Sequence, residues 1–131
     1  MTPTNNPVSA VQLPHPLPTQ SVTGFPISAL PFHSQVQVIT NWAKAGRSKV
    51  VCVSNVHMIM EGHWDRQFAQ VLRRADLLTP DGMPLAWMTG LMKGQAQERV
   101  AGMELMSALC KQAQQKDMSL FLLGSTPEML T

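Results

Sequence analysis

The sequence predicts an α/β fold in which helices flank a parallel sheet. Short apolar runs at residues 49–54, 76–79 and 119–123 have the length of strands, and helical apolar spacing fills the intervals between them. Four successive apolar residues in the first run are typical of a parallel strand buried on both faces. About three strands would form a sheet with one edge and one face uncovered. We therefore expect a truncated unit that a partner or a longer chain completes.

The first 23 residues are expected to form a disordered tail. They hold five of the ten prolines and no charged side chain, and proline supports neither helix nor ladder hydrogen bonding. The folded part is then expected to span residues 24–131. Its first segment, 24–27, suits an edge strand or a hairpin arm. A helix capped by Ser34 follows, and Gly46 ends it.

The next elements follow from caps, turns and apolar spacing. A helix is expected directly after the strand at 49–54, a second at about 64–74, and a Pro-Asp-Gly turn after the strand at 76–79. Further helices are expected at 83–93 and 102–115. The side chains predicted to face inward are Val38, Ile39, Trp42, Phe68, Val71, Leu72, Leu85, Met88, Leu91, Met92, Met103, Leu105, Met106, Leu109 and Cys110. The strand at 119–123 leads to a glycine turn and to a helix that starts at Pro127.

The composition excludes several classes of protein. A net charge of +2 with scattered basic residues argues against nucleic-acid binding. No apolar run is long enough to span a membrane, and the N-terminus does not resemble a signal peptide. The chain has neither a GxSxG motif for a hydrolase nor a GxGxxG motif for a nicotinamide cofactor. Cys52 and Cys110 lack metal-ligand spacing and are expected to be buried free thiols.

Several polar groups are expected at the edge where the parallel strands end, which is where open α/β sheets bind ligands. Each has a structural explanation: Asp81 suits a turn, Ser54-Asn55 a helix cap, and Arg99 an ion pair with Glu98. Together they offer a carboxylate base, an amide for a sugar hydroxyl and a guanidinium for phosphate. Gly124 and Ser125 precede a helix start and add backbone N–H groups for a phosphate.

His57 and His63 flank Glu61 and raise the question of a metal site. Two histidines six residues apart do not share a helical face, so we expect no metal there. His57 lies one helical turn beyond the strand end and could face the same cleft as Asn55.

Four blocks of the sequence resemble, in order and spacing, the WecG/TagA/CpsF glycosyltransferase family. They are VCVSNVHMIME at 51–61, ADLLTPDGMPLAW at 75–87, QERVAGMELM at 97–106 and LFLLGSTPE at 120–128. The resemblance covers residues 24–131 and identifies them with the N-terminal part of the family's domain. It implies a Rossmann-like sheet.

The resemblance also implies an activity. Family members are inverting transferases that move an N-acetylmannosamine-type sugar from a UDP-sugar donor to a polyprenyl-diphosphate-linked acceptor. Their products are wall teichoic acid linkage units, enterobacterial common antigen and exopolysaccharides. By position, Asp81 matches the catalytic base, Asn55 an asparagine at the sugar site, and Arg99 the arginine of the third block. Ser54 is the nearest hydroxyl.

The resemblance implies no metal or other cofactor and a cytoplasmic location, peripheral at the inner face of the membrane. Membrane contact would come through a C-terminal segment that this sequence does not contain. The uncovered sheet and the methionine-rich helices favour self-association as a homo-oligomer. The alternative hypothesis is a non-catalytic α/β module that binds a nucleotide or a partner.

Overall fold

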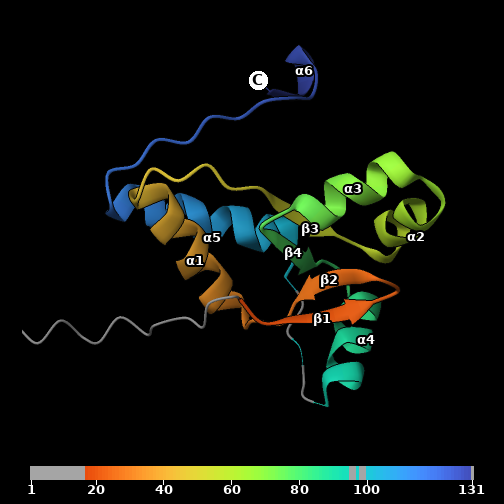
Figure 1. The fold of residues 1–131 in the computed structure, drawn as a ribbon. Helices are drawn as coiled ribbons and strands as arrows, with labels where there is room; N and C mark the ends of the chain where they lie inside the picture. The colour runs from red at the N-terminus through yellow and green to blue at the C-terminus, as the bar shows by residue number, and fades with distance from the viewer. Residues whose placement is uncertain (1–16, 95–96, 98–99, 131) are drawn as a thin grey trace, which may run out of the picture.

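The computed structural model describes residues 17–94, 97 and 100–130. It is a mixed α/β structure with a small parallel sheet and flanking helices, as predicted (Figure 1). In chain order the elements are β1 (Thr19–Val22), β2 (Phe25–Ser28), α1 (Phe32–Lys44), β3 (Val51–Ser54), α2 (Val56–Trp64), α3 (Arg66–Arg74), β4 (Leu77–Pro80), α4 (Met83–Lys93), α5 (Gly102–Gln115) and α6 (Pro127–Leu130).

An antiparallel hairpin opens the described chain. Its strands, β1 and β2, pair from Thr19 with Ser28 to Val22 with Phe25. Gly24, at φ 86°, turns the chain where side chains other than glycine are strained. The hairpin arm expected at 24–27 is therefore present. Its partner β1, however, lies within the segment expected to be a disordered tail, because pairing with β2 orders residues 19–22 despite the prolines before them.

The parallel sheet has two strands in the part of the chain that the structure describes. β3 and β4 pair from Val51 with Leu77 to Ser54 with Pro80. All four residues of β4 are buried, whereas Val51 to Val53 are only half-buried. The prediction that β3 is buried on both faces is therefore met only in part: Cys52 packs on one side and Val51 and Val53 on the other, but no strand covers the second edge of β3 in the described chain.

The strand expected at 119–123 does not form. This segment leaves the end of α5 and extends toward α6 without pairing to another strand (Figure 1), and both Phe121 and Leu123 are about nine-tenths exposed. An isolated extended segment has no partner for its backbone hydrogen bonds, so apolar β-forming residues alone do not make it a strand. Pro127 does begin α6, as predicted.

The helices match the predicted positions well. α4 and α5 have the expected bounds, and Gly94 ends α4 in the left-handed conformation at φ 73°. α1 begins at Phe32 after Pro31, so Ser34 lies inside it and is not its cap. Asp65 separates α2 from α3 and caps α3 by accepting hydrogen bonds from the N–H groups of Gln67 and Phe68.

Several side chains expected to face inward are exposed instead. The corrected residues are Val71, Leu91, Met92, Met103, Met106 and Cys110. Apolar spacing identifies a helix but does not say which apolar residue has a neighbour to pack against.

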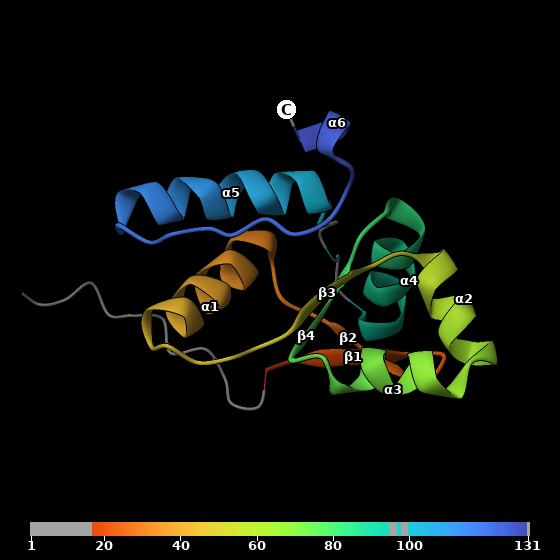
Figure 2. The same ribbon diagram turned by 90° about the horizontal axis from the view of Figure 1, so that it is seen from above.

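The core has helices on both sides of the small sheet. On one side, α1 packs against α5, with Val36, Leu105 and Val53 of β3 in one apolar cluster. On the other, the hairpin, α2, α3 and α4 enclose Leu78 of β4 (Figure 2). The sheet is therefore held firmly enough to position side chains at its carboxyl end. None of the described helices is both long and apolar enough to cross a bilayer.

Candidate active site

The carboxyl ends of β3 and β4 are joined directly. The backbone N–H of Asp81 donates to the carbonyl oxygen of Ser54 at 2.7 Å. Ser54 is the last residue of β3, and Asp81 follows the last residue of β4. The parallel pairing therefore brings these two predicted site residues to the same edge of the sheet, as the sequence analysis expected.

The carboxylate of Asp81 lies between the starts of two helices. Gly82, at φ 98°, is the N-cap of α4, and Gly102 is the first residue of α5. A Cβ atom on Gly102 would lie 4.0 Å from Asp81 Oδ2 and 3.7 Å from a methyl carbon of Val53. Helix N-termini carry partial positive charge, so this position suits a carboxylate or another anion.

Asp81 is half-buried and remains available for chemistry. Its carboxylate takes part in neither of the ion pairs found among the described residues, which are Lys49 with Asp76 and His57 with Glu61. A carboxylate that is partly shielded from water and not neutralised by a cation can accept a proton from a bound hydroxyl group.

Ser54 and Asn55 differ in what their side chains do. Ser54 is fully buried, and its Oγ has no hydrogen-bond partner within the described part of the chain. Buried hydroxyl groups normally have a partner, so this one is unusual, but full burial keeps it out of reach of a ligand in this conformation and its assignment to the site stays a prediction. Asn55 caps α2, because its Oδ1 accepts a hydrogen bond of 2.9 Å from the N–H of Met58. The cap explanation of Asn55 is confirmed, and its amide NH2 is still available for a substrate.

Arg99 lies outside the described residues, as does Glu98. The next residue, Val100, is fully buried, and its N–H donates to the carbonyl oxygen of Pro80 at 2.9 Å. The segment that follows Arg99 in the sequence is thus attached to the end of β4, directly before Asp81.

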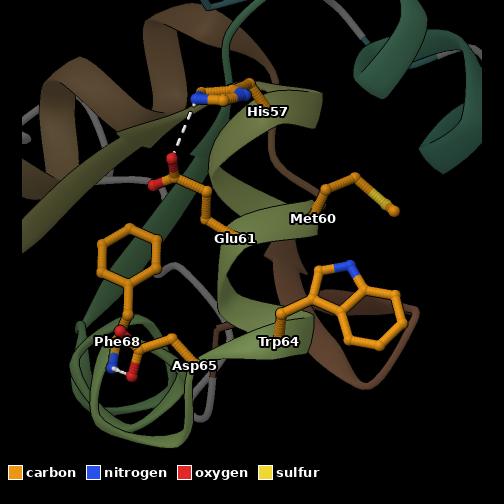
Figure 3. A pocket seen from close by; sticks show the side chains of 6 residues that line it. All are labelled: His57, Met60, Glu61, Trp64, Asp65 and Phe68. Carbon is orange, nitrogen blue, oxygen red and sulfur yellow. Dashed lines mark hydrogen bonds and ion pairs between the residues drawn. The ribbon is translucent and has the colours of Figure 1, made fainter.

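His57 lies on the exposed face of α2 rather than beside Asp81. Its Nε2 is 3.0 Å from Glu61 Oε1, one helical turn away (Figure 3). These two residues line a shallow hollow of about 620 Å³. The other residues around the hollow are Met60, Trp64, Asp65 and Phe68. No described contact links His57 to Asp81, so its assignment to the site stays a prediction.

Gly124 and Ser125 are not brought to the sheet edge. Both are exposed, and α6 stands apart from the sheet at the end of an extended segment in both views (Figures 1 and 2). Ser125 has φ 68°, which fits a tight turn before the helix. Their expected role as phosphate ligands stays a prediction.

The cysteines differ in environment. Burial raises the pKa of the Cys52 thiol on β3, so this group stays protonated. Cys110 is exposed on α5, contrary to the expectation that both thiols are buried. Among the residues that the structure describes, no three histidine, cysteine or acidic side chains gather as metal ligands would.

Two residues beside Asp81 were missed as site residues by sequence reasoning. They are Gly102, which allows α5 to start against the carboxylate, and Val100, which attaches this loop to β4. Two signals could have found Gly102. It is a glycine at the first position of an amphipathic helix, and the residue before it, Ala101, is not one of the usual capping residues Ser, Thr, Asn or Asp.

Comparison with known proteins identifies the family of this chain. Residues 20–131 match the glycosyl transferase WecG/TagA/CpsF family. One similar protein is the N-acetylglucosaminyldiphosphoundecaprenol N-acetyl-beta-D-mannosaminyltransferase of Bacillus spizizenii, which is 24% identical over 91 residues. That match covers 70% of this chain but only 35% of the relative. The family match extends over nearly the whole described fold, including both strands that meet at Asp81, and the chain belongs to the WecG/TagA/CpsF glycosyltransferase family.

Proposed function

We propose that this chain carries the catalytic base of a glycosyltransferase that uses a UDP-sugar donor. The sugar is of the N-acetylmannosamine type, and the acceptor is a sugar linked through diphosphate to a polyprenol. The name of the relative from Bacillus spizizenii specifies an N-acetylmannosaminyl group and a diphosphoundecaprenol-linked acceptor, which supports the proposed sugar and the proposed acceptor. The observation that carries the proposal is the position of Asp81 at the sheet edge between two helix starts, where its carboxylate is in no ion pair with any described residue.

In the proposed reaction, Asp81 accepts the proton of the acceptor hydroxyl as its oxygen attacks the anomeric carbon of the donor. The bond between that carbon and the diphosphate oxygen breaks, and UDP leaves with the electron pair. Attack from the side opposite UDP inverts the anomeric configuration. The half-buried position of Asp81 suits this role, because partial exclusion of water strengthens the interaction between the carboxylate and the hydroxyl group.

The other residues would bind the two substrates. The exposed side chain of Asn55 uses its Oδ1 for the helix cap, which leaves its NH2 for a sugar hydroxyl group, whereas the buried Oγ of Ser54 would reach the sugar only after a local opening. We assign Arg99 to the diphosphate of the donor, since the sequence places it one residue before Val100, which is bonded to the end of β4. Reaction with a polyprenyl-linked acceptor would take place at the inner face of the cytoplasmic membrane. Teichoic acid linkage units and exopolysaccharides are the proposed products.

The proposal is tested by incubating the protein that carries this chain with a UDP-N-acetylhexosamine and a short polyprenyl-diphosphate-N-acetylglucosamine. Mass spectrometry of the lipid product should show the addition of one N-acetylhexosamine, and NMR should show an inverted anomeric centre. Transfer with retention would contradict the mechanism. UDP binding without transfer to any such acceptor would favour the alternative of a non-catalytic nucleotide-binding module.

A further inference from the structure

Gly82 joins β4 to α4 through an unusual backbone conformation. Its φ is 98° and its ψ is 143°, which is close to the mirror image of the extended region and outside the left-handed helical region. Residues with a side chain are strongly disfavoured at such angles. Positive φ alone does not require glycine in this chain, because Thr23, Asp117 and Ser125 have φ values of 49°, 54° and 68°.

Lack of space is not what requires glycine at position 82. Among the described residues, a Cβ atom on Gly82 would meet only Cδ of Pro84, at 4.0 Å, which is an ordinary contact distance. Gly94, at the other end of α4, has φ 73° and ψ 14°, the usual left-handed conformation of a residue that ends a helix. The backbone angles of Gly82 therefore explain the glycine.

The chain is fixed on both sides of Gly82. Before it, the N–H of Asp81 donates to the carbonyl oxygen of Ser54 at 2.7 Å, and every residue of β4 is buried. After it, Leu85 and Ala86 are buried, and the N–H of Ala86 donates to the carbonyl oxygen of Gly82 at 3.2 Å. Neither β4 nor α4 is therefore free to shift if residue 82 becomes strained.

The peptide between residues 81 and 82 is the part of the chain that a side chain at position 82 would disturb. If the flanking elements stay in place, a change of φ at residue 82 rotates this peptide, since φ and ψ are the soft angles of the backbone. The Cα atom at one end of the peptide carries the Asp81 carboxylate, whose Oδ2 lies 4.0 Å from the Cβ position of Gly102 at the start of α5. No ion pair with a described residue holds this carboxylate, so its position depends on the backbone that carries it.

We infer that Gly82 is a positioning residue for the transfer reaction. The backbone angles that glycine allows at position 82 hold the Asp81 carboxylate beside the start of α5, where the hydroxyl group of the acceptor would bind. This inference rests on the proposed function, because the position of the carboxylate matters to the reaction only if Asp81 is the base. Gly82 then places a reacting group in addition to joining two elements.

A double-mutant cycle in the full-length protein tests whether Gly82 acts through Asp81. Gly82→Ala alone should lower the turnover number by about tenfold or more with little change in KM for the donor, because a misplacement of about 1 Å is costly. In the Asp81→Asn background the same substitution should change turnover by less than about twofold, since the two residues act as a unit. A second loss of about tenfold in that background would overturn the inference.

Gly94→Ala is the matched control. It also places alanine at a glycine of positive φ on α4, and no described atom lies within 4 Å of its Cβ position. It should lower the melting temperature slightly and keep wild-type turnover. Equal losses of turnover in Gly82→Ala and Gly94→Ala would show that both glycines only stabilise the helix, which overturns the inference.

A milder variant covers the case in which Gly82→Ala does not fold. Asparagine tolerates positive φ better than alanine, but mostly in the left-handed helical region, so Gly82→Asn should fold and still lose turnover. Full turnover in Gly82→Asn would contradict the inference.

The NMR signal of the Asp81 side-chain carboxyl carbon gives a readout that does not depend on transfer. Its loss in Asp81→Asn identifies the signal. It should shift in Gly82→Ala and stay unchanged in Gly94→Ala, whereas an unchanged signal in Gly82→Ala would overturn the inference. If the signal shifts but Asp81→Asn transfers sugar at the wild-type rate, the failure lies in the proposed base and not in the positioning of the carboxylate.

Discussion

The N–H of Asp81 donates to the carbonyl oxygen of Ser54 at 2.7 Å, so the last residue of β3 holds the carboxylate that follows β4. This bond continues the parallel pairing of Ser54 with Pro80 by one step. Because both strands are anchored in packed clusters, the position of Asp81 is fixed by the fold rather than by the loop that contains it.

The variant Ser54→Ala tests separately whether the buried hydroxyl group contributes to stability and whether it contributes to substrate binding. Its Oγ has no partner in the described structure, so Ser54→Ala should change the free energy of unfolding by less than about 1 kcal/mol. If the hydroxyl binds substrate, the same variant should raise KM for a substrate severalfold. Urea titration and steady-state transfer rates measure the two effects. A large loss of stability would show that the hydroxyl has a structural partner in the native protein.

Gly102 controls the space beside Asp81. A Cβ atom here would make only ordinary contacts, at 3.7 Å or more, but a longer side chain would extend over the carboxylate. We expect Gly102→Leu to reduce transfer by about tenfold or more with a nearly unchanged melting temperature, and Gly102→Ala to have an intermediate effect. This range follows from the cost of misplacing reacting groups by about 1 Å. Full activity in Gly102→Leu would show that the acceptor does not bind on the Gly102 side of Asp81.

Gly62 is a test of packing far from the chemistry. A Cβ atom on Gly62 would lie 2.9 Å from Phe25 Cζ and 3.0 Å from Leu72 Cδ1, and both side chains are buried. Gly62→Ala should therefore destabilise the fold by about 1–3 kcal/mol, as overpacking does. Gly102→Ala is the control for stability, because its Cβ has room. Equal unfolding midpoints in the two variants would contradict the packing of the hairpin on α2 and α3.

The sequence predicted local elements better than it predicted their partners. Proline and glycine signals gave the bounds of α4, apolar spacing gave those of α5, and the parallel order of the strands placed Asp81 beside Ser54. The prediction of a strand at 119–123 was wrong, because a strand forms only beside a neighbouring strand that the local sequence does not specify. The exposed Leu91 and Met103 were misassigned for a similar reason, since apolar spacing alone does not distinguish a buried face of a helix from an exposed one.

Hydrogen exchange tests whether β4 is paired and the segment at 120–123 is not. The amides of Thr79 and Asp81, in and beside the buried strand β4, should exchange slowly. Those of Leu120 to Leu123 should exchange at nearly the rate of an unfolded peptide, because none of them donates a backbone hydrogen bond in the described structure. Strong protection of the latter group would show that this segment pairs as a strand after all.

The most direct measurement compares the transfer rate of Asp81→Asn with that of Asp117→Asn. Both variants remove one negative charge, and Asp117 is exposed at φ 54°, a conformation that asparagine tolerates. If Asp81 is the base, Asp81→Asn should lower the turnover number by about 100-fold or more while donor affinity stays nearly unchanged. Asp117→Asn should keep wild-type turnover. Turnover in Asp81→Asn equal to that of Asp117→Asn would contradict the assignment of Asp81 as the catalytic base.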